Sequence, residues 1–137
     1  MVAKTLRNLL RPSRVAHAHC DLPCGVYDPA QARIEAESVK AICEKYQQNT
    51  DAAFRARALQ IKEERSDLVK HHLWVLWTDY FKPPHFEKYP NLHQLFNDAT
   101  KLAGAGGTKG STDPATADAL LARIDEIAKI FWDTKQG

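Results

Sequence analysis

The longest stretch of helical periodicity in the chain runs from residue 50 to residue 81 and contains neither glycine nor proline. Its apolar stripe alternates spacings of four and three residues, which is the period of an α-helix. The stripe consists of Phe54, Ala58, Ile61, Arg65, Leu68, His72 and Val75. Two polar residues, Arg65 and His72, therefore fall on a face that we expect to be buried. We predict one helix over about 51–81, ended by Pro83 and Pro84.

Three further segments have the same periodicity, and no segment alternates in polarity for long enough to predict a strand. Together the predicted helices span about 29–47, 51–81, 91–103 and 114–134. The pairs Asp28-Pro29 and Asp113-Pro114 each place a capping acid before a proline that suits the first helical position. Four amphipathic helices with short connections predict an all-α fold, an antiparallel four-helix bundle with an irregular N-terminal segment.

The core positions of the other three helices follow from the same periodicity. They are Ile34, Val39, Ile42 and Tyr46 in the first, Leu92, Leu95, Phe96, Ala99 and Leu102 in the third, and Ala117, Leu120, Ile124, Ile127 and Phe131 in the fourth. Residues 82–90 are expected to form a rigid loop, and Gly104–Gly110 a flexible surface connection. A second apolar face includes Leu73, Leu76, Trp77, Tyr80 and Trp132. This face indicates self-association, although Trp and Tyr are often half-exposed on monomers.

Composition excludes several classes of protein. The 137 residues are 44% apolar and 26% charged, which is typical of a single soluble globular domain. No apolar run approaches the ~20 residues that cross a bilayer, so we expect no membrane association. The formal net charge of +2 comes from residues 1–18, where four bases precede the first acid, Asp21. The remainder is slightly acidic and lacks the basic face that nucleic-acid binding requires.

Residues 1–18 are basic and contain no acid, as is typical of a targeting or processing segment. Arg7 interrupts the apolar run that a secretory signal needs, and Pro12 limits an amphipathic targeting helix. The sequence Ala-His-Ala at 16–18 resembles a small-residue cleavage site. We therefore expect residues 1–18 to be a cleavable leader and residues 19–137 to form the domain. The alternative is a terminal tail that stays attached.

The three cysteines fall into two groups. Cys43 lies beside the apolar stripe of the first helix and is predicted to be a buried thiol that packs as a small hydrophobe. Cys20 and Cys24 have the spacing C-x3-C in a turn-rich segment, residues 19–28, which we call the hook. A disulfide within the hook is geometrically possible but would close a small loop and contribute little stability. Zinc sites and redox pairs normally use C-x2-C, and no second pair of zinc ligands is present.

A planar metal site becomes possible if cleavage follows residue 18. His19 would then carry a free amine, which can act together with the backbone nitrogen and thiolate of Cys20 and the thiolate of Cys24. Two nitrogens and two sulfurs in a plane favour Ni(II) or Cu(II) over tetrahedral zinc. The His19 imidazole is placed to approach from the axial side. Pro23 and Gly25 partly preorganise the turn that returns Cys24 toward Cys20.

The hook sequence HCDLPCGVYDP, residues 19–29, resembles the nickel hook of the nickel-dependent superoxide dismutases. The similarity continues through YFKPPHFEKYP at residues 80–90 and IFW at residues 130–132. It implies a four-helix bundle that assembles as a hexamer, a leader that is removed to expose His19, and one nickel ion per subunit. The metal would cycle between Ni(II) and Ni(III). The implied reaction is 2 O2•− + 2 H+ → O2 + H2O2.

The resemblance also implies roles for residues in and near the hook. The expected metal ligands are His19, Cys20 and Cys24. Asp21 and Tyr27 match hook positions that line the access of substrate to the metal. Lys82 and Lys88 are placed to draw the anion inward by long-range attraction, and solvated surface lysines are the alternative.

Three residues outside the hook are expected to support it. Glu35 would hydrogen-bond the His19 imidazole, and Arg65 would support Glu35. This pairing gives a reason for a charge on a buried stripe, because a buried Arg without a partner is costly. An ordinary core ion pair is the alternative role for Arg65. Tyr80 is expected to hydrogen-bond Tyr27.

The main hypothesis is a cytoplasmic, homo-oligomeric, nickel-dependent superoxide dismutase. Its expected partners are superoxide as substrate, a leader-processing protease and further copies of the chain, with no nucleic acid. The rival hypothesis is a non-catalytic helical module that binds a metal or senses thiol oxidation through Cys20 and Cys24. His19 discriminates between them, because the rival should survive loss of its imidazole or an uncut leader and the enzyme should not.

Overall fold

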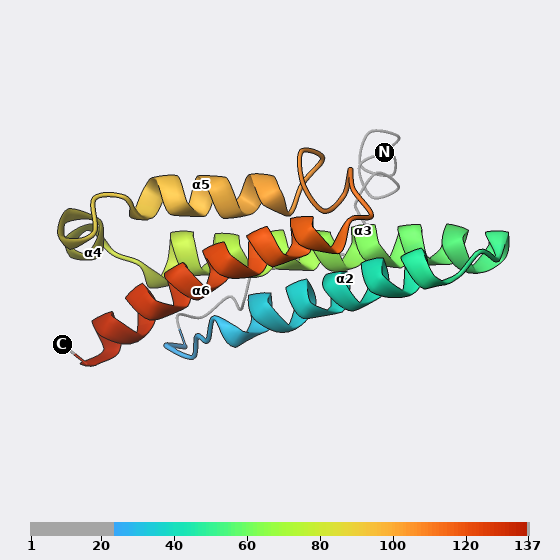
Figure 1. Ribbon diagram of the computed structural model, residues 1–137. Coiled ribbons are helices and arrows are strands. Elements are labelled where there is room, and N and C mark those ends of the chain that lie inside the picture. The colour runs from blue at the N-terminus through green and yellow to red at the C-terminus, as the bar shows by residue number, and fades with distance from the viewer. Residues whose placement is uncertain (1–23, 137) are drawn as a thin grey trace, which may run out of the picture.

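The computed structural model describes residues 24–136, and every regular element in this range is helical. The elements are α2 (Ala30–Gln48), α3 (Ala52–Val75), η1 (Leu76–Tyr80), α4 (Pro83–Lys88), α5 (Leu92–Leu102) and α6 (Pro114–Gln136). Helices α2 and α3 form an antiparallel hairpin, α5 lies along α3, and α6 crosses in front of α3 (Figure 1). Helix α6 contacts both α2 and α5, so the four long helices enclose a main core, and a second small buried cluster lies between α2 and α6. The predicted all-α four-helix bundle is therefore confirmed.

The predicted helix starts agree with the structure to within a residue or two. The Asp28 carboxylate accepts a hydrogen bond from the Ala30 amide at 2.8 Å. The Asp113 carboxylate accepts one from the Ala115 amide at 2.9 Å, in the same acid-proline setting. At the start of α3, Asp51 accepts from the amide of Phe54 at 2.9 Å. These side chains satisfy amides that have no acceptor within the first turn of a helix.

The predicted core faces are confirmed for α5 and α6 and mostly wrong for α2 and α3, where only Val39, Ala58 and Val75 of the predicted residues are buried. In α5 and α6 all the predicted residues are buried except Leu102, which is partly buried. In α3 the buried face is Ala58, Lys62, Ser66, Val69 and Leu73, it continues with Leu76 of η1, and the neighbouring Val75 is buried as well. From position 62 onward this face lies one residue after the predicted stripe, which turns the helix by about 100°. Apolar side chains occupy both faces of α3, so periodicity alone does not reveal which face is buried.

Helix α2 also turns a different face to the core. Its buried residues are Ala32, Ala36, Val39 and Cys43, whereas the predicted core residue Ile34 is 59% exposed. The small side chains of Ala32 and Ala36 lie in the same buried cluster as Val69 and Leu73 of α3. Alanine therefore takes the core positions at which the two helices meet, and the larger isoleucine faces outward.

The proline-rich segment 82–90 contains a helix, α4, where a rigid loop was expected. Pro83 and Pro84 occupy its first positions, where a helix needs no backbone donor. The Lys82 amide donates to the His85 ring nitrogen Nδ1 at 3.0 Å, and the His85 amide donates to the Lys82 carbonyl at 2.9 Å. The two prolines that end the preceding helix therefore also begin the next one.

The connection between α5 and α6, residues 103–113, is packed into the bundle, so the expected flexible surface connection is wrong. We call this segment the glycine loop. Thr108 is only 1% exposed, and its hydroxyl lies 2.8 Å from that of Ser66. A Cβ on Gly107 would lie 1.9 Å from the Leu102 carbonyl oxygen, so only glycine fits there. The buried Lys62 ammonium donates to the carbonyls of three residues of the loop, Thr108, Lys109 and Ser111.

The long helix ends in a wider turn. The Phe81 amide donates to the Leu76 carbonyl at 3.0 Å, which is the i→i+5 bond of a π-turn. Such turns occur often at functional sites, because the extra residue redirects the side chains that follow. Tyr80, the last residue of η1, packs half-buried against the core. Among residues 24–136, none of the helices has the length and apolar content needed to cross a membrane.

Candidate metal centre

Cys24 is the first residue that the structure describes, and its thiol is exposed. The Val26 amide donates to the Cys24 sulfur at 3.4 Å. Gly25 makes this approach possible with a φ of +71°, in the left-handed region that favours glycine. The Cys24 sulfur also lies 3.9 Å from the Val26 carbonyl, to which the thiol can donate, so both polar groups of Val26 hold it in place. The turn therefore presents Cys24 as a preorganised sulfur donor.

The other predicted ligands, His19 and Cys20, lie outside the described residues, as does Asp21. Between residues 24 and 136, no three His, Cys, Asp or Glu side chains gather into a group that could hold a metal. A metal bound by Cys24 would therefore need donors from the residues that precede it. The sequence just before Cys24 contains His19 and Cys20, whose nitrogen and sulfur atoms are of the types that suit a thiolate-rich nickel site.

Tyr27 follows Cys24 by three residues and packs half-buried against the main core. Its ring centroid lies 5.6 Å from that of Tyr80. The Tyr80 ring in turn lies 4.3 Å from the Phe131 ring of α6. We call Tyr27, Tyr80 and Phe131 the aromatic cluster. Through these ring contacts the end of the hook packs against the end of η1 and the last turns of α6.

The predicted hydrogen bond between Tyr27 and Tyr80 stays a prediction, although the two rings are neighbours. The Tyr80 hydroxyl lies 2.6 Å from the Thr134 hydroxyl of α6. A phenol can donate one hydrogen bond and also accept, so this contact leaves Tyr80 capable of a second one.

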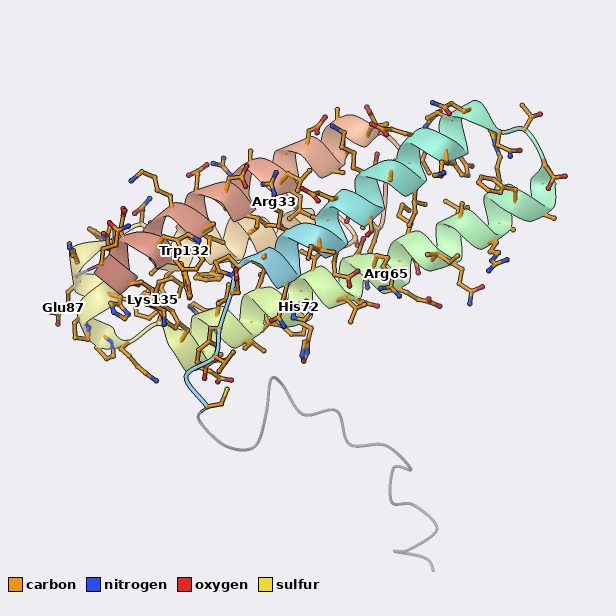
Figure 2. The ribbon with its side chains drawn as sticks, turned by 90° about the horizontal axis from the view of Figure 1, so that it is seen from below. Arg33, Arg65, His72, Glu87, Trp132 and Lys135 are labelled. Atoms are coloured by element: carbon orange, nitrogen blue, oxygen red, sulfur yellow. The ribbon has the colours of Figure 1, made fainter. Side chains whose placement is uncertain are left out.

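The structure pairs Glu35 of α2 with Arg65 of α3. Nη1 of Arg65 lies 3.1 Å and 3.3 Å from the two carboxylate oxygens of Glu35. The Glu35 side chain is 17% exposed and the Arg65 side chain 39%, so the carboxylate is the more protected partner. Figure 2 shows Arg65 along α3, with His72 on the same helix nearer the end where α2 begins. We expect the His19 imidazole to donate a hydrogen bond to Glu35, but His19 lies outside the described residues, so this bond stays a prediction.

Sequence reasoning missed two residues that contact Tyr80 from the last turn of α6. Besides Thr134, the ammonium of Lys135 lies over the Tyr80 ring, 5.2 Å from its centroid. Figure 2 shows Lys135 near the C-terminal end of α6, beside α4. The only sequence signal was their place directly after the IFW segment at 130–132.

The remaining candidates occupy ordinary positions. Lys82 and Lys88 are exposed, and the Lys82 ammonium donates to the carbonyl of Asp79 at 2.9 Å. Cys43 is 1% exposed, so the predicted buried thiol is confirmed. Burial raises the pKa of the Cys43 thiol above its usual value. A neutral, enclosed thiol of this kind is a poor metal ligand.

Residues 14–135 match the family model described as nickel-containing superoxide dismutase. The chain belongs to the nickel-containing superoxide dismutase family. The enzymes named Superoxide dismutase [Ni] from Streptomyces coelicolor and Streptomyces seoulensis are each 62% identical to it over 131 residues. Each match covers 96% of this chain and 98% of the relative.

Solved structures of nickel superoxide dismutase share the fold. A native structure superposes with a TM-score of 0.84 at 65% identity and covers 87% of this chain and 100% of its own. A structure whose nickel ligation corresponds to the oxidised state has the same values. An apo structure matches with a TM-score of 0.80 at 63% identity, over 82% of this chain and 100% of its own. The helical bundle of this chain is thus that of nickel superoxide dismutase.

Proposed function

We propose that this chain disproportionates superoxide to dioxygen and hydrogen peroxide at a nickel ion held by His19, Cys20 and Cys24, one ion per subunit. Membership of the nickel-containing superoxide dismutase family carries this proposal. The described part of the site supports it, because Gly25 and the Val26 amide hold the Cys24 sulfur in an exposed turn. When bound, nickel would supply the one-electron chemistry that takes one electron from one superoxide and gives one electron to another.

The residues around the hook would orient it and control access. Tyr27 and Asp21 are the proposed residues of the substrate channel, and Tyr80 holds the Tyr27 ring from the bundle side. Glu35, fixed by Arg65, would accept a hydrogen bond from the His19 imidazole and keep that ring in place. The Glu35–Arg65 pair spans α2 and α3, so the bundle itself would position the metal's histidine.

We further propose that residues 1–18 are a leader that a protease removes, and that residues 19–137 form the mature enzyme in the cytoplasm. Nickel superoxide dismutase structures match over their full length yet cover 87% of this chain, which supports a mature chain shorter than 137 residues. Removal of the leader would convert the His19 backbone nitrogen from an amide into an amine. The amine is the better metal donor, so cleavage would complete the site.

Self-association into a hexamer is the proposed oligomeric state. Large apolar side chains remain exposed on α2, α3 and α6 in the single subunit, including Ile34, Phe54, Trp74, Trp77 and Trp132. Two of them lie together: Trp74 of α3 and Trp77 of η1 line one surface hollow of about 460 Å³ beside α5. Contacts between copies would remove this apolar surface from water.

The test compares a chain that begins at His19 with its His19→Ala variant, both loaded with nickel. Nickel content and superoxide consumption are measured on the same samples. The proposal predicts fast consumption by the first protein and a large loss in the variant, even where nickel remains bound. Equal consumption by the two proteins would contradict the assigned role of His19. No consumption by either protein, with nickel bound, would leave a non-catalytic metal-binding module as the better account.

A further inference from the structure

The last turn of α6 controls the hydroxyl of Tyr80. The Thr134 hydroxyl lies 2.6 Å from the Phe131 carbonyl oxygen and 2.6 Å from the Tyr80 hydroxyl oxygen. Both contacts are short for O–H···O bonds, so each needs a hydrogen between its two oxygens. All three groups lie in the described part of the bundle and are half-buried or buried.

The number of hydroxyl hydrogens decides which group donates in each of the two bonds. A carbonyl oxygen cannot donate, so the hydrogen in the first contact belongs to Thr134. Thr134 has only one hydroxyl hydrogen, and it is therefore not available to Tyr80. The hydrogen in the second contact must then come from Tyr80. From this geometry we infer that Thr134 is a positioning residue of the dismutase: its hydroxyl accepts the hydrogen bond that the Tyr80 hydroxyl donates, so the Tyr80 oxygen can act only as an acceptor toward any other partner.

The Tyr80 ring is held as firmly as its hydroxyl. Phe131 packs against the ring with its centroid at 4.3 Å, and the Lys135 ammonium lies over the ring at 5.2 Å. The same ammonium lies 5.5 Å from the Phe131 ring centroid. Residues 131, 134 and 135 thus fix Tyr80 from a single helical turn. The Tyr80 oxygen has one direction of hydrogen bonding left, because its own hydrogen is committed to α6.

The consequence for the hook concerns Tyr27, the nearest hook residue in the described chain. Its ring is 5.6 Å from that of Tyr80, so a hydrogen bond between the two phenols would have Tyr27 as donor. Such a bond would fix the orientation of the Tyr27 hydroxyl beside the proposed substrate channel. The effect on rate rests on the proposed function, whereas the bond from Tyr80 to Thr134 does not.

A threonine hydroxyl that bonds a carbonyl of its own helix is common and needs no functional role. The test must therefore ask whether Thr134 acts through Tyr80. A double-mutant cycle on the chain that begins at His19 combines Thr134→Val with Tyr80→Phe. Thr134→Ser keeps the hydroxyl and serves as the conservative variant. Thr78→Val is the matched control, because the Thr78 hydroxyl bonds the Trp74 carbonyl at 2.7 Å in the same manner.

Two quantities are measured: the unfolding equilibrium constant of the metal-free chain and kcat/KM for superoxide of the nickel-loaded chain. We expect Thr134→Val to raise the unfolding constant about fivefold and to lower kcat/KM about fivefold. Each change is the equivalent of one net hydrogen bond. In the Tyr80→Phe background the same substitution should change each by less than about twofold. Thr134→Ser should match the parent chain, and Thr78→Val should leave kcat/KM unchanged.

An equal effect of Thr134→Val in both backgrounds would overturn the inference, since Thr134 would then act through the Phe131 carbonyl alone. Coupling in the unfolding constant without coupling in kcat/KM would overturn its role in the reaction. If the parent chain with bound nickel consumes no superoxide, the proposed function fails. The unfolding cycle would still decide whether Tyr80 donates to Thr134.

Discussion

Two regions of the bundle hold a polar group in place by different means. In the glycine loop, the Lys62 ammonium is buried, and its three hydrogens meet three backbone carbonyls at 2.5–2.9 Å. In the aromatic cluster, Tyr80 is half-buried and its hydroxyl has one bond to α6 with accepting capacity left over. Among residues 24–136, the first region uses all three donors of its ammonium, whereas the Tyr80 hydroxyl can still accept a hydrogen bond. Full pairing of a buried charge stabilises the fold, whereas a hydroxyl that can accept a further bond can serve the site.

The comparison implies that substitutions in the two regions have opposite consequences. A change at the hook should reduce activity more than stability. A change at the glycine loop should reduce stability more than the activity of each folded molecule.

The largest expected effect is on the hook side, with Cys24→Ser. This substitution removes a proposed nickel ligand, so superoxide consumption should fall by about 100-fold or more. The free energy of unfolding of the metal-free chain should change by less than about 0.5 kcal/mol, because Cys24 is exposed. Nickel content, kcat/KM and urea unfolding are measured together. Full nickel content with unchanged kcat/KM would show that Cys24 is not a ligand.

The second largest effect is expected for Lys62→Met, which removes the cation that binds the glycine loop. Methionine fills similar space but donates no hydrogen bond, so buried carbonyls lose their partner. We expect the free energy of unfolding to fall by about 3 kcal/mol, measured by urea denaturation, with kcat/KM per folded molecule unchanged. Lys101→Met, at an exposed position of α5, is the control and should cost less than about 0.5 kcal/mol. A stable Lys62→Met protein with reduced kcat/KM would reverse the distinction between the regions.

A smaller effect concerns the charge of Lys135 over Tyr80. The substrate is an anion, so a cation beside the aromatic cluster should raise its local concentration. Lys135→Met should lower kcat/KM about two- to threefold at low ionic strength and converge with the parent at high salt. Lys129→Met, which removes a charge paired with Asp133 on the same helix, is the control. An identical salt dependence of all three proteins would remove the steering role from Lys135.

The smallest expected effect is the pH dependence that Cys43 contributes. Burial raises the pKa of this thiol in the folded chain, so the unfolded chain releases the proton at lower pH. The thiol's contribution to stability is therefore complete below the unfolded pKa and is lost as pH rises from there through the folded pKa. Cys43→Ala should flatten the alkaline fall in unfolding free energy by no more than about 1.4 kcal/mol per pH unit. Parallel curves for the two proteins above pH ~8.5 would contradict this account.

The extents of the four long helices could be predicted closely from acids, prolines and apolar spacing, whereas the short helix α4 and the π-turn η1 could not. The buried faces of α5 and α6 could be predicted as well, since their apolar residues lie on one side. The faces of α2 and α3 could not, because Ala32 and Ala36 pack in the core while Ile34 faces outward. Apolar spacing reports the period of a helix and does not report which of two apolar faces a neighbour covers.

The site shows the same limits. The hook motif pointed to Cys24, and the resemblance pointed to Glu35 and Arg65, which the structure pairs. Thr134 and the glycine-loop contacts of Lys62 could not be predicted, because their partners lie 54 and 46–49 residues away along the chain. Such contacts are created by the packing of the bundle and leave no local pattern.

The most direct test of the account is superoxide consumption by the nickel-supplied chain that begins at His19, beside the same preparation with residues 1–18 attached. The account predicts fast consumption by the trimmed chain alone, because only that chain offers the His19 amine to nickel. Equal consumption by both chains would contradict the role of the amine. Consumption by neither, with nickel bound to the trimmed chain, would contradict the dismutase function itself.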